Sequence, residues 1–419
     1  MSKTNRCGSD LSETLELVRL GHDGDGVTAD GVFVPFTVPG DVVRAARSNS
    51  RARVESILAP GPWRTAPACR HFGACGGCAL QHVAREPYLA WKRELVVTAL
   101  RQRGFEDVAV DEVRAVPPGT RRRAVFKARK TGGAVALGFQ ERDSRTLVDL
   151  GECPVLVPAL VRLIDPLKKA LANILGEDDT AEVHATATDA GADLSLKWKR
   201  ARSPEALMSM AQIARDLDLA RLTWNGEPVS IARTPALRVG KFTVALPPEP
   251  FLQPTGEGER ILQELVLEGV GPARCVADLF AGCGTFALML ADGRKVRAVE
   301  ENGSMLEALA AATKGTKVET ERRDLFRRPL SPPELAPFDA AVIDPPRPGA
   351  KAQAEMLAKS AVPRIVYVSC NPASFARDAR ILCDGGYVMR RVVPVDQFLW
   401  SAHVELAAVL ERDARARLC

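Results

Sequence analysis

The second half of the chain alternates short apolar runs with longer stretches of mixed character. The runs lie within residues 274–279, 296–300, 319–324, 338–344 and 365–370. Apolar runs this short predict buried strands, and the stretches between them are long enough for helical crossovers. The pattern therefore predicts an open α/β fold with a mainly parallel sheet.

Each predicted strand ends in a polar residue capable of chemistry: Asp278, Glu300, Asp324, Asp344 and Cys370. An acidic residue of this kind, standing singly, is more often a helix cap or a solvated turn, and a lone cysteine is more often inert. The carboxyl ends of parallel strands, however, face the crevice in which open α/β sheets bind ligands. Five such residues in succession predict a ligand site at this edge.

The first of these strands runs into a glycine turn, Asp278-Leu-Phe-Ala-Gly-Cys-Gly284. Glycines let the backbone approach a ligand closely, and a helix predicted to follow presents free N–H groups to it. The third glycine of the dinucleotide fingerprint is missing, which argues against a pyrophosphate ligand. Glu300 ends the next strand, where dinucleotide enzymes place a carboxylate on ribose hydroxyls. We therefore expect a ligand that carries a ribose.

The N-terminal part has a different pattern. Short alternating segments at Leu15–Arg19, Gly31–Pro35 and Asp41–Ala45 are separated by glycine- and proline-rich turns, which predicts a small β-barrel. Residues from about 117 to 246 alternate strand-like and helix-like segments, which predicts a central α+β domain. A helix-like segment at Tyr88–Arg103 is a candidate to pack on the C-terminal domain.

The chain of 419 residues fits about three domains, at residues 11–66, 67–246 and 247–419. No apolar run is long enough to span a bilayer, and the start carries no signal peptide, so we expect a cytoplasmic protein without membrane contact. The sequence does not reveal the oligomeric state, and a monomer is compatible with it.

Charge is concentrated in one region. Residues 44–130 hold eighteen Lys and Arg against seven Asp and Glu, a net +11, whereas the whole chain carries +5. The run Arg121–Arg123 with Lys127, Arg129 and Lys130 is typical of a phosphate-binding surface, although a solvated basic face is the ordinary alternative. If this surface binds a nucleic acid, Phe33, Phe36 and Phe126 are the candidates for stacking on its bases.

Three cysteines, Cys69, Cys75 and Cys78, cluster with glycines, and Cys153 follows alone before a proline. A disulfide is a poor interpretation for a chain expected in a reducing compartment. Three cysteines clustered with glycines predict a metal-binding loop, for which zinc is the generic candidate because four thiolate ligands suit it.

The chain resembles the class I S-adenosylmethionine-dependent RNA (uracil-5-)-methyltransferases over nearly its whole length. The glycine turn and Glu300 are followed in the family's order by Asp344-Pro-Pro-Arg347, Ser369-Cys-Asn-Pro372 and His403-Val-Glu405. Phe251-Leu-Gln253 matches a family segment just before the catalytic domain. The resemblance implies a multidomain α/β protein with a TRAM-like RNA-binding barrel and a C-terminal Rossmann-like methyltransferase domain.

The resemblance also implies the chemistry. C5 of uracil is too weak a nucleophile to attack a sulfonium methyl group, so a thiolate first adds to C6 and a base later removes the C5 proton. Cys370 is the implied nucleophile and Glu405 the implied base. The residues implied around S-adenosylmethionine are Gln253, Phe280, Thr285, Glu300, Asp324 and Asp344.

The spacing of Cys69, Cys75, Cys78 and Cys153 resembles the [4Fe–4S] site of the ribosomal-RNA branch of this family, so iron–sulfur is preferred over zinc. A structural cluster and a ribosomal RNA substrate are therefore expected. Cys283, inside the glycine turn, is the one rival nucleophile.

Two other functions stay open. Asp344-Pro-Pro, where the family has Asp-Pro-Ala, is similar to the loop of amino-group methyltransferases, which need neither Cys370 nor Glu405. A non-catalytic RNA-binding assembly factor is the second alternative. Thr255 and the segment Phe398-Leu-Trp-Ser401 also depart from the family pattern.

Overall fold

The computed structural model describes residues 11–413, so residues 1–10 and 414–419, including the end of the expected third domain, lie outside the described part. The chain divides into two compact units. The first holds the described residues up to Trp91 together with residues 141–144 and 400–402, and the second holds the rest. No helix among the described residues is both long and apolar enough to cross a membrane.

Five strands of the first unit close into a barrel. They are β1 (Leu11–Leu20), β2 (Gly26–Thr28), β3 (Phe33–Val34), β4 (Val42–Ser48) and β5 (Arg51–Ala59). Hydrogen bonds join them in the order β1, β2, β3, β5, β4, and β4 pairs back with β1. Alternate residues such as Leu15, Leu17, Val43 and Ala45 fill the interior, because side chains of a strand point to opposite faces in turn. The small N-terminal barrel expected from the sequence is confirmed.

The second unit contains a seven-stranded sheet in the order β13, β12, β11, β10, β7, β8, β9. Its strands are β7 (Arg123–Thr131), β8 (Ala134–Gln140), β9 (Leu147–Asp149), β10 (Thr180–Thr188), β11 (Gly191–Trp198), β12 (Arg221–Trp224) and β13 (Glu227–Ile231). The helices α2 (Pro158–Val161), α3 (Ile164–Ala172) and α4 (Pro204–Asp216) are interspersed with them. A two-stranded ribbon of β14 (Ala236–Val239) and β15 (Phe242–Ala245) follows.

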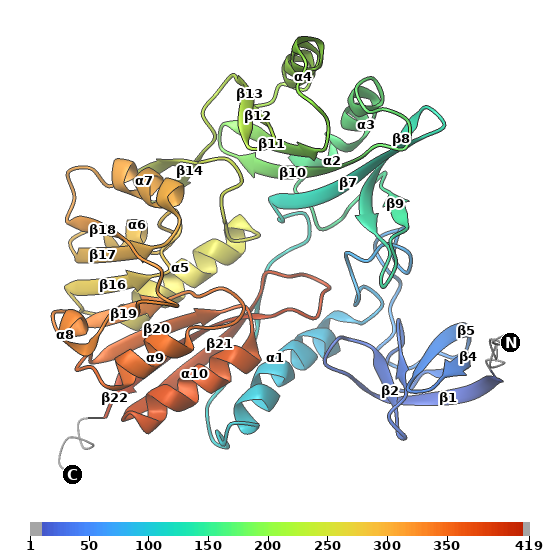
Figure 1. Cartoon of the computed structure of the whole chain (residues 1–419). Helices are drawn as coiled ribbons and strands as arrows, with labels where there is room; N and C mark the ends of the chain where they lie inside the picture. The colour runs from blue at the N-terminus through green and yellow to red at the C-terminus, as the bar shows by residue number, and fades with distance from the viewer. Residues whose placement is uncertain (1–10, 414–419) are drawn as a thin grey trace, which may run out of the picture. The chain divides into compact units, whose positions relative to one another are not determined.

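The second unit also contains an eight-stranded sheet in the order β18, β17, β16, β19, β20, β22, β21, β6 (Figure 1). Its strands are β6 (Arg114–Ala115), β16 (Cys275–Leu279), β17 (Lys295–Glu300), β18 (Val318–Arg322), β19 (Ala340–Ile343), β20 (Arg364–Ser369), β21 (Tyr387–Asp396) and β22 (Glu405–Arg412). The strands from β16 to β20 run parallel, and β22 is antiparallel to both β20 and β21. The predicted open α/β sheet is confirmed.

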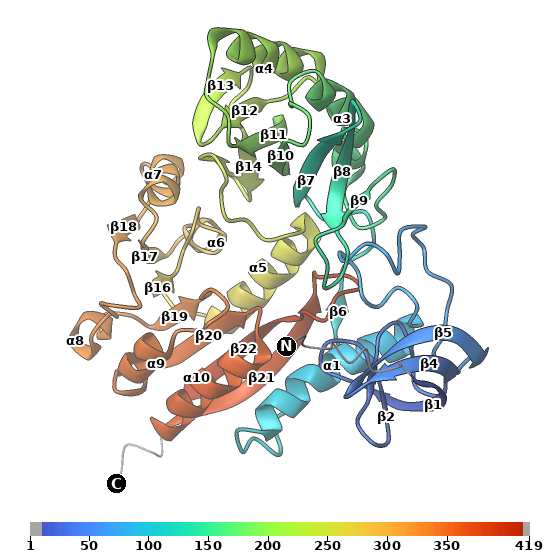
Figure 2. The ribbon, with the colours of Figure 1, turned by 45° about the vertical axis from the view of Figure 1, so that its right-hand side comes forward.

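Helices cover both faces of this sheet (Figure 2). They are α5 (Gly256–Val270), α6 (Ala287–Leu290), α7 (Gly303–Ala312), α8 (Pro332–Leu335), α9 (Lys351–Ala358) and α10 (Pro372–Asp384). Ala341 and Ile343 of β19 pack into one apolar core with α8, α9 and α10, whereas Ala340 and Val342 pack into the other with α5, α6 and α7. This double coverage explains why the central strands β19 and β20 are apolar on both faces, whereas the edge strand β18 is largely polar.

Two segments from earlier in the chain join this catalytic sheet. Helix α1 (Arg85–Arg101) contributes Val96 and Leu100 to the same core as α9 and α10. Strand β6 pairs with the end of β21 at the sheet's edge. The strand order reverses at β16, which pairs with β17 on one side and β19 on the other. A crevice is expected outside the carboxyl ends of the strands at such a point.

Candidate active site

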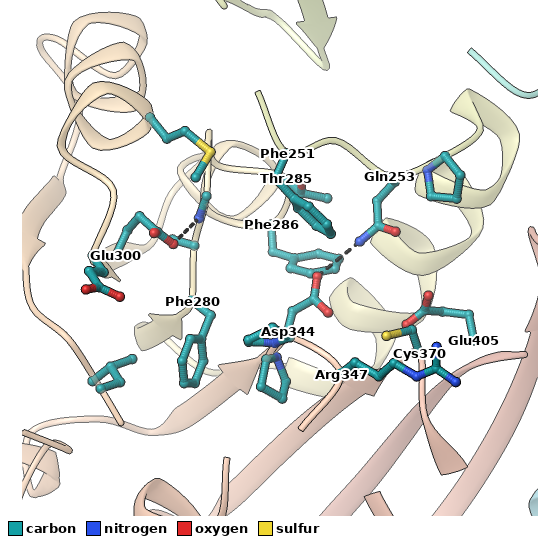
Figure 3. A pocket seen from close by; sticks show the side chains of 18 of the residues that line it. Phe251, Gln253, Phe280, Thr285, Phe286, Glu300, Asp344, Arg347, Cys370 and Glu405 are labelled. Carbon is teal, nitrogen blue, oxygen red and sulfur yellow. Dashed lines mark hydrogen bonds between the residues drawn. The ribbon is translucent and has the colours of Figure 1, made fainter. Parts of the chain in front are cut away.

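A cavity of about 450 Å³ opens at the carboxyl ends of the parallel strands. Figure 3 shows Glu300 at one end and Cys370 beside Glu405 at the other, with Phe280 and Thr285 between them. Of the implied cofactor residues, Gln253, Phe280, Thr285, Glu300 and Asp344 line the cavity. Asp324 is absent from its wall, although its neighbours Arg323, Leu325 and Phe326 belong to it.

The turn after β16 forms the floor of the cofactor end. Phe280, Gly282 and Gly284 all have positive φ angles, of 65°, 56° and 95°. A Cβ on Gly284 would lie 2.4 Å from a methyl carbon of Leu309, so no larger residue fits there without a shift. The helix expected to follow is only the single turn α6. The ligand-facing backbone is therefore mainly that of the turn itself.

Two acidic residues fix neighbouring loops by accepting backbone N–H bonds. Glu300 accepts from Gly282 at 3.0 Å and from Asn302 at 2.8 Å while it lines the cavity. Asp324 accepts from Phe326 and Arg327 at 2.9 and 3.1 Å. Asp324 thereby shapes the turn that carries Phe326, whereas Glu300 also faces the cavity.

Phe326 is a cavity residue that sequence analysis missed. Its ring lies 5.4 Å from that of Phe280 at an angle of 57°, and its side chain is 45% exposed. Two aromatic rings on one wall can hold a flat heterocycle. The only signal in the sequence was an aromatic residue two positions after Asp324, which has no distinctive spacing.

Cys370 follows β20 directly, and Asn371 caps helix α10 by accepting from the N–H of Ala373 at 3.1 Å. The thiol is half-buried and lines the cavity. Burial raises its pKa to about 11, and the negative charges of Glu405 and Asp344 contribute to the rise. A thiol in this setting stays protonated at neutral pH until a base takes its proton.

A hydrogen-bond chain connects the acidic groups of the reactive end. Gln397 Nε2 donates to Glu405 Oε2 at 2.8 Å and to Gln253 Oε1 at 2.7 Å. Gln253 Nε2 in turn donates to Asp344 Oδ2 at 3.0 Å. Gln397 is buried and had not been recognised in the sequence, because no periodicity or motif distinguishes a single glutamine.

Both carboxyl groups in this chain hold their protons unusually tightly. Burial raises the pKa of Glu405 to about 8, and the nearby charge of Asp344 raises it as well. Burial also raises the pKa of Asp344 to about 7, against the lowering effect of the bond from Gln253. Two interacting carboxyls in an apolar site favour states in which at least one is protonated. Groups that exchange protons near neutral pH suit acid–base chemistry.

The rival cysteine lies in a different environment. Cys283 is buried in the core on the α5, α6 and α7 face and does not line the cavity. Burial raises its pKa to about 12, with Glu300 and Glu259 as further causes. Asp278 is likewise buried beneath the turn and does not reach the cavity. Cys370 is thus the cysteine available to a ligand in this cavity.

The expected basic surface is partly used for structure. Arg122 donates to the backbone oxygen of Gln253 at 3.0 Å and forms an ion pair with Glu259. Lys130 donates to two backbone carbonyls, and Lys127 pairs with Glu182. Arg123 lines the cavity and lies 4.9 Å from the ring centre of Phe251.

The phenylalanines predicted to stack on bases differ in how far their rings are exposed. Phe126 is buried against Phe139, so it cannot stack on a base. Phe36 contacts Phe72 and His82, and Phe33 is 37% exposed. Phe251, which sequence analysis did not select for stacking, is 58% exposed at the cavity.

The structure gives no support to the expected iron–sulfur cluster. Cys69, Cys75 and Cys78 lie in a turn-rich segment of the first unit, and Cys153 belongs to the second. None of these four cysteines, all within the described residues, forms a disulfide bond. Within residues 11–413, no three His, Cys, Asp or Glu side chains form a group that could hold a metal ion.

Comparisons with known proteins agree with this site. A model of the tRNA (Uracil-5-)-methyltransferase family matches residues 304–413. An uncharacterized RNA methyltransferase of Brucella suis biovar 1 (strain 1330) is 48% identical, with 95% of this chain and 97% of that protein covered. The 23S rRNA (uracil(1939)-C(5))-methyltransferase RlmD of Halomonas elongata is 35% identical, with 98% and 92% covered.

Among solved structures, the tRNA (uracil-54, C5)-methyltransferase of Pyrococcus abyssi in complex with S-adenosyl-L-homocysteine superposes with a TM-score of 0.76. The match covers 94% of this chain and 99% of that one, at 25% identity. The chain is an enzyme that uses S-adenosylmethionine to methylate RNA, and it belongs to the RNA (uracil-5-)-methyltransferase family.

Proposed function

We propose that the enzyme methylates C5 of a specific uridine through a covalent adduct, with Cys370 as nucleophile and Glu405 as base. The main support for this proposal is that Cys370 and Glu405 lie together in the same cavity. A half-buried thiol and a buried carboxyl with a pKa near 8 share one cavity wall, close enough for the charge of one to shift the pKa of the other.

The steps follow from these groups. Cys370 gives its proton to a neighbouring ionised carboxylate and forms a bond from sulfur to C6, which moves the C5–C6 π electrons into an enolate over C5, C4 and O4. C5 then takes the methyl group, and the sulfonium sulfur keeps the electron pair of the broken bond. Glu405 as carboxylate removes the C5 proton. The C–H electrons restore the C5–C6 double bond, and the bond to sulfur breaks with its pair on Cys370.

The other end of the cavity suits the cofactor, which supplies the methyl group and a positive sulfonium charge. Glu300 is positioned for ribose hydroxyls, and the rings of Phe280 and Phe326 suit the adenine. Thr285 and Gln253 complete the wall, and Asp324 acts through the turn that carries Phe326. Gln253 connects this end to the hydrogen-bond chain that runs from Asp344 through Gln397 to Glu405.

Ribosomal RNA is the proposed substrate, since the relative from Halomonas elongata is named for it. The RNA is expected to contact the five-stranded barrel and the basic residues around Arg123. The uridine must leave any stacked structure to reach Cys370. The amino-group alternative is disfavoured because Gln253 already engages Asp344, and because Cys370 and Glu405, which that reaction does not need, converge on the cavity.

Covalent trapping tests the proposal. The enzyme is incubated with S-adenosylmethionine and ribosomal RNA that carries 5-fluorouridine, and a denaturation-resistant complex is sought by gel. Fluorine cannot leave C5 as a proton does, so the adduct should persist in the wild type and be absent in Cys370→Ala. Methylation of ordinary RNA without any adduct would favour the amino-group reaction. The same experiment with transfer RNA that carries 5-fluorouridine shows which of the two RNA classes forms the adduct.

A [4Fe–4S] cluster on Cys69, Cys75, Cys78 and Cys153 stays a proposal supported by their spacing alone. Anaerobically purified protein should contain about four iron and four sulfide per chain. Cys75→Ser should lose both, whereas Cys383→Ser, which changes a cysteine of α10, should keep them. Iron-free wild-type protein that is fully active would contradict the proposal.

A further inference from the structure

Helix α1 carries a lysine whose charged end is enclosed in protein. The side chain of Lys92 has no exposed surface, and neither does that of its partner Asp396. Lys92 Nζ donates to Asp396 Oδ1 at 2.9 Å, to the backbone oxygen of Phe398 at 3.4 Å, and to the backbone oxygen of His403. An ammonium group has three N–H donors, so these three acceptors use all of them.

The three acceptors lie at the two ends of the segment that leads into the proposed base, Glu405. Residues 397–404 join β21 to β22, which starts at Glu405. Phe398, His403 and Glu405 line the cavity, and Gln397 donates to Glu405. Lys92 binds the segment at its start, through Asp396 and Phe398, and near its end, through His403. The ammonium therefore closes the segment into a loop just before Glu405.

The tip of this segment is anchored by a second side chain of the same helix. Tyr88 lies one helical turn before Lys92, and its hydroxyl accepts from the N–H of Trp400 at 2.8 Å. The Trp400 carbonyl accepts from the N–H groups of Ala79 and Leu80 at 2.8 and 3.1 Å. Trp400 has a φ of 57°, which is unfavourable for a bulky residue and persists only where surrounding contacts impose it.

Packing alone does not require a lysine at this position. A buried ion pair is weak evidence for stability, because apolar side chains of similar volume often serve as well or better. Three directed bonds to fixed backbone and carboxylate oxygens instead specify one conformation of the loop. The site that depends on this conformation is the end of the cavity at which Glu405 meets Cys370.

We infer that Lys92 is a positioning residue for Glu405, holding the 397–404 segment so that the carboxylate reaches the C5 proton of the covalent intermediate. The inference rests on the proposed function. Thiol addition and methyl transfer depend on Cys370 at the end of β20, whereas release of the product depends on Glu405. Loosening the segment should therefore slow release more than it slows addition.

The double variant Lys92→Met with Asp396→Asn removes both buried charges together, so neither is left unpaired. With S-adenosylmethionine and ordinary substrate RNA, its turnover number should fall about tenfold or more. The fraction of enzyme held as denaturation-resistant RNA adduct during turnover should rise several-fold above that of the wild type, towards that of Glu405→Gln. Cooperative thermal unfolding checks that the variant is folded.

Arg364→Met is the matched control. Arg364 also joins a carboxylate to a backbone carbonyl, through Glu411 at 2.5 Å and Gly269 at 3.2 Å, but at the opposite end of β20 from Cys370. Its adduct fraction should equal that of the wild type. Tyr88→Phe is a milder variant that removes the hydroxyl acceptor of the Trp400 bond and keeps the ring, so it tests the same segment if the double variant does not fold. It should raise the adduct fraction about twofold.

A fall in turnover with no rise in adduct fraction would overturn the inference, because a general loss of packing slows every step together. An adduct fraction that rises equally in Arg364→Met would overturn it too. If wild-type enzyme fails to trap RNA that carries 5-fluorouridine, the proposed function fails and this inference with it. If the wild type traps that RNA while every folded variant has the same adduct fraction during turnover as the wild type, the anchoring role alone is wrong.

Discussion

The two ends of the active-site cavity are built differently. Most of the cofactor end comes from one stretch of the chain, residues 280–326, in which consecutive strand ends and turns face the cavity. The reactive end brings together Gln253, Asp344, Cys370, Gln397 and Glu405 from separate elements. Its alignment therefore depends on the whole fold, whereas that of the cofactor end is largely local.

The difference also concerns how each end is held in place. Backbone N–H groups bind the carboxylates of Glu300 and Asp324, and all but the one of Gly282 lie two or three residues further along the chain. The reactive end depends on buried side-chain amides and carboxyls, where each group relies on its neighbour. Such networks fix one geometry when complete and are costly when broken. Substitutions of Cys370 or Glu405 should therefore impair catalysis while they spare cofactor binding.

Cys370→Ala should have the largest effect. Loss of a nucleophile that acts as part of a catalytic unit should lower methyl transfer by at least ~10³-fold, with no adduct on RNA that carries 5-fluorouridine. Binding of S-adenosylmethionine, measured by calorimetry, should be unchanged, because the cofactor end is built independently. Cys383→Ala replaces a half-buried cysteine of α10 and should stay fully active. A Cys370→Ala enzyme that still methylates RNA would remove the thiol from the reaction.

Glu405→Gln should come next, with turnover lowered by ~10² to 10⁴-fold. The amide can still accept the bond from Gln397, so the network should stay in place. Addition of Cys370 to C6 and methyl transfer should continue, and the methylated adduct should accumulate on ordinary RNA. Equal slowing of adduct formation and release would instead assign Glu405 to the deprotonation of Cys370.

The sequence predicted the two ends unequally well, for the same physical reason. Glu300 and the glycine turn follow from local strand and turn patterns, and the structure has them on the cavity wall. The position of Cys370 at a strand end was also readable from its apolar run. Gln397 and Lys92 were not, because their importance lies in partners that are distant along the chain, namely Gln253 and His403. No local pattern specifies such a pairing.

Misjudged residues illustrate the same limit. Arg122 and Lys130 belong to a basic run in the sequence, yet the fold directs them to Glu259 and to backbone carbonyls. Phe126 has the composition of a stacking platform but faces inward on β7. Which face a strand residue occupies depends on the sheet that it joins. Charge and aromatic content alone could not determine this.

The reactive end should also give stability a pH dependence. Burial raises the pKa of Glu405 in the folded state to about 8, above the ordinary value of 4.5 for this side chain. A carboxyl whose pKa is raised by folding stabilises the protein while it is protonated, and this contribution is lost as the pH rises towards 8. Between pH 6 and 8, the free energy of unfolding of the wild type should fall by about 2 kcal/mol more than that of Glu405→Gln, as measured by urea unfolding. Parallel pH profiles would contradict the raised pKa.

The smallest effects should come from two aromatic residues, one for each ligand. Phe326 belongs to the cofactor end, and its replacement by alanine should weaken S-adenosylmethionine binding about three- to tenfold, as expected for one lost aromatic contact. Phe251 is exposed at the cavity beside Arg123, so Phe251→Ala should raise KM for RNA about tenfold while it leaves cofactor affinity unchanged.

Each variant of this pair serves as the control for the other. If the two ends are independent, Phe326→Ala should keep its KM for RNA, because the ring of Phe326 packs against Phe280 at the cofactor end. If both substitutions weaken both ligands, Gln253 and Asp344 would connect the ends energetically as well as structurally, since their hydrogen bond is the link between them. A double-mutant cycle with Gln253→Ala would then measure that coupling directly.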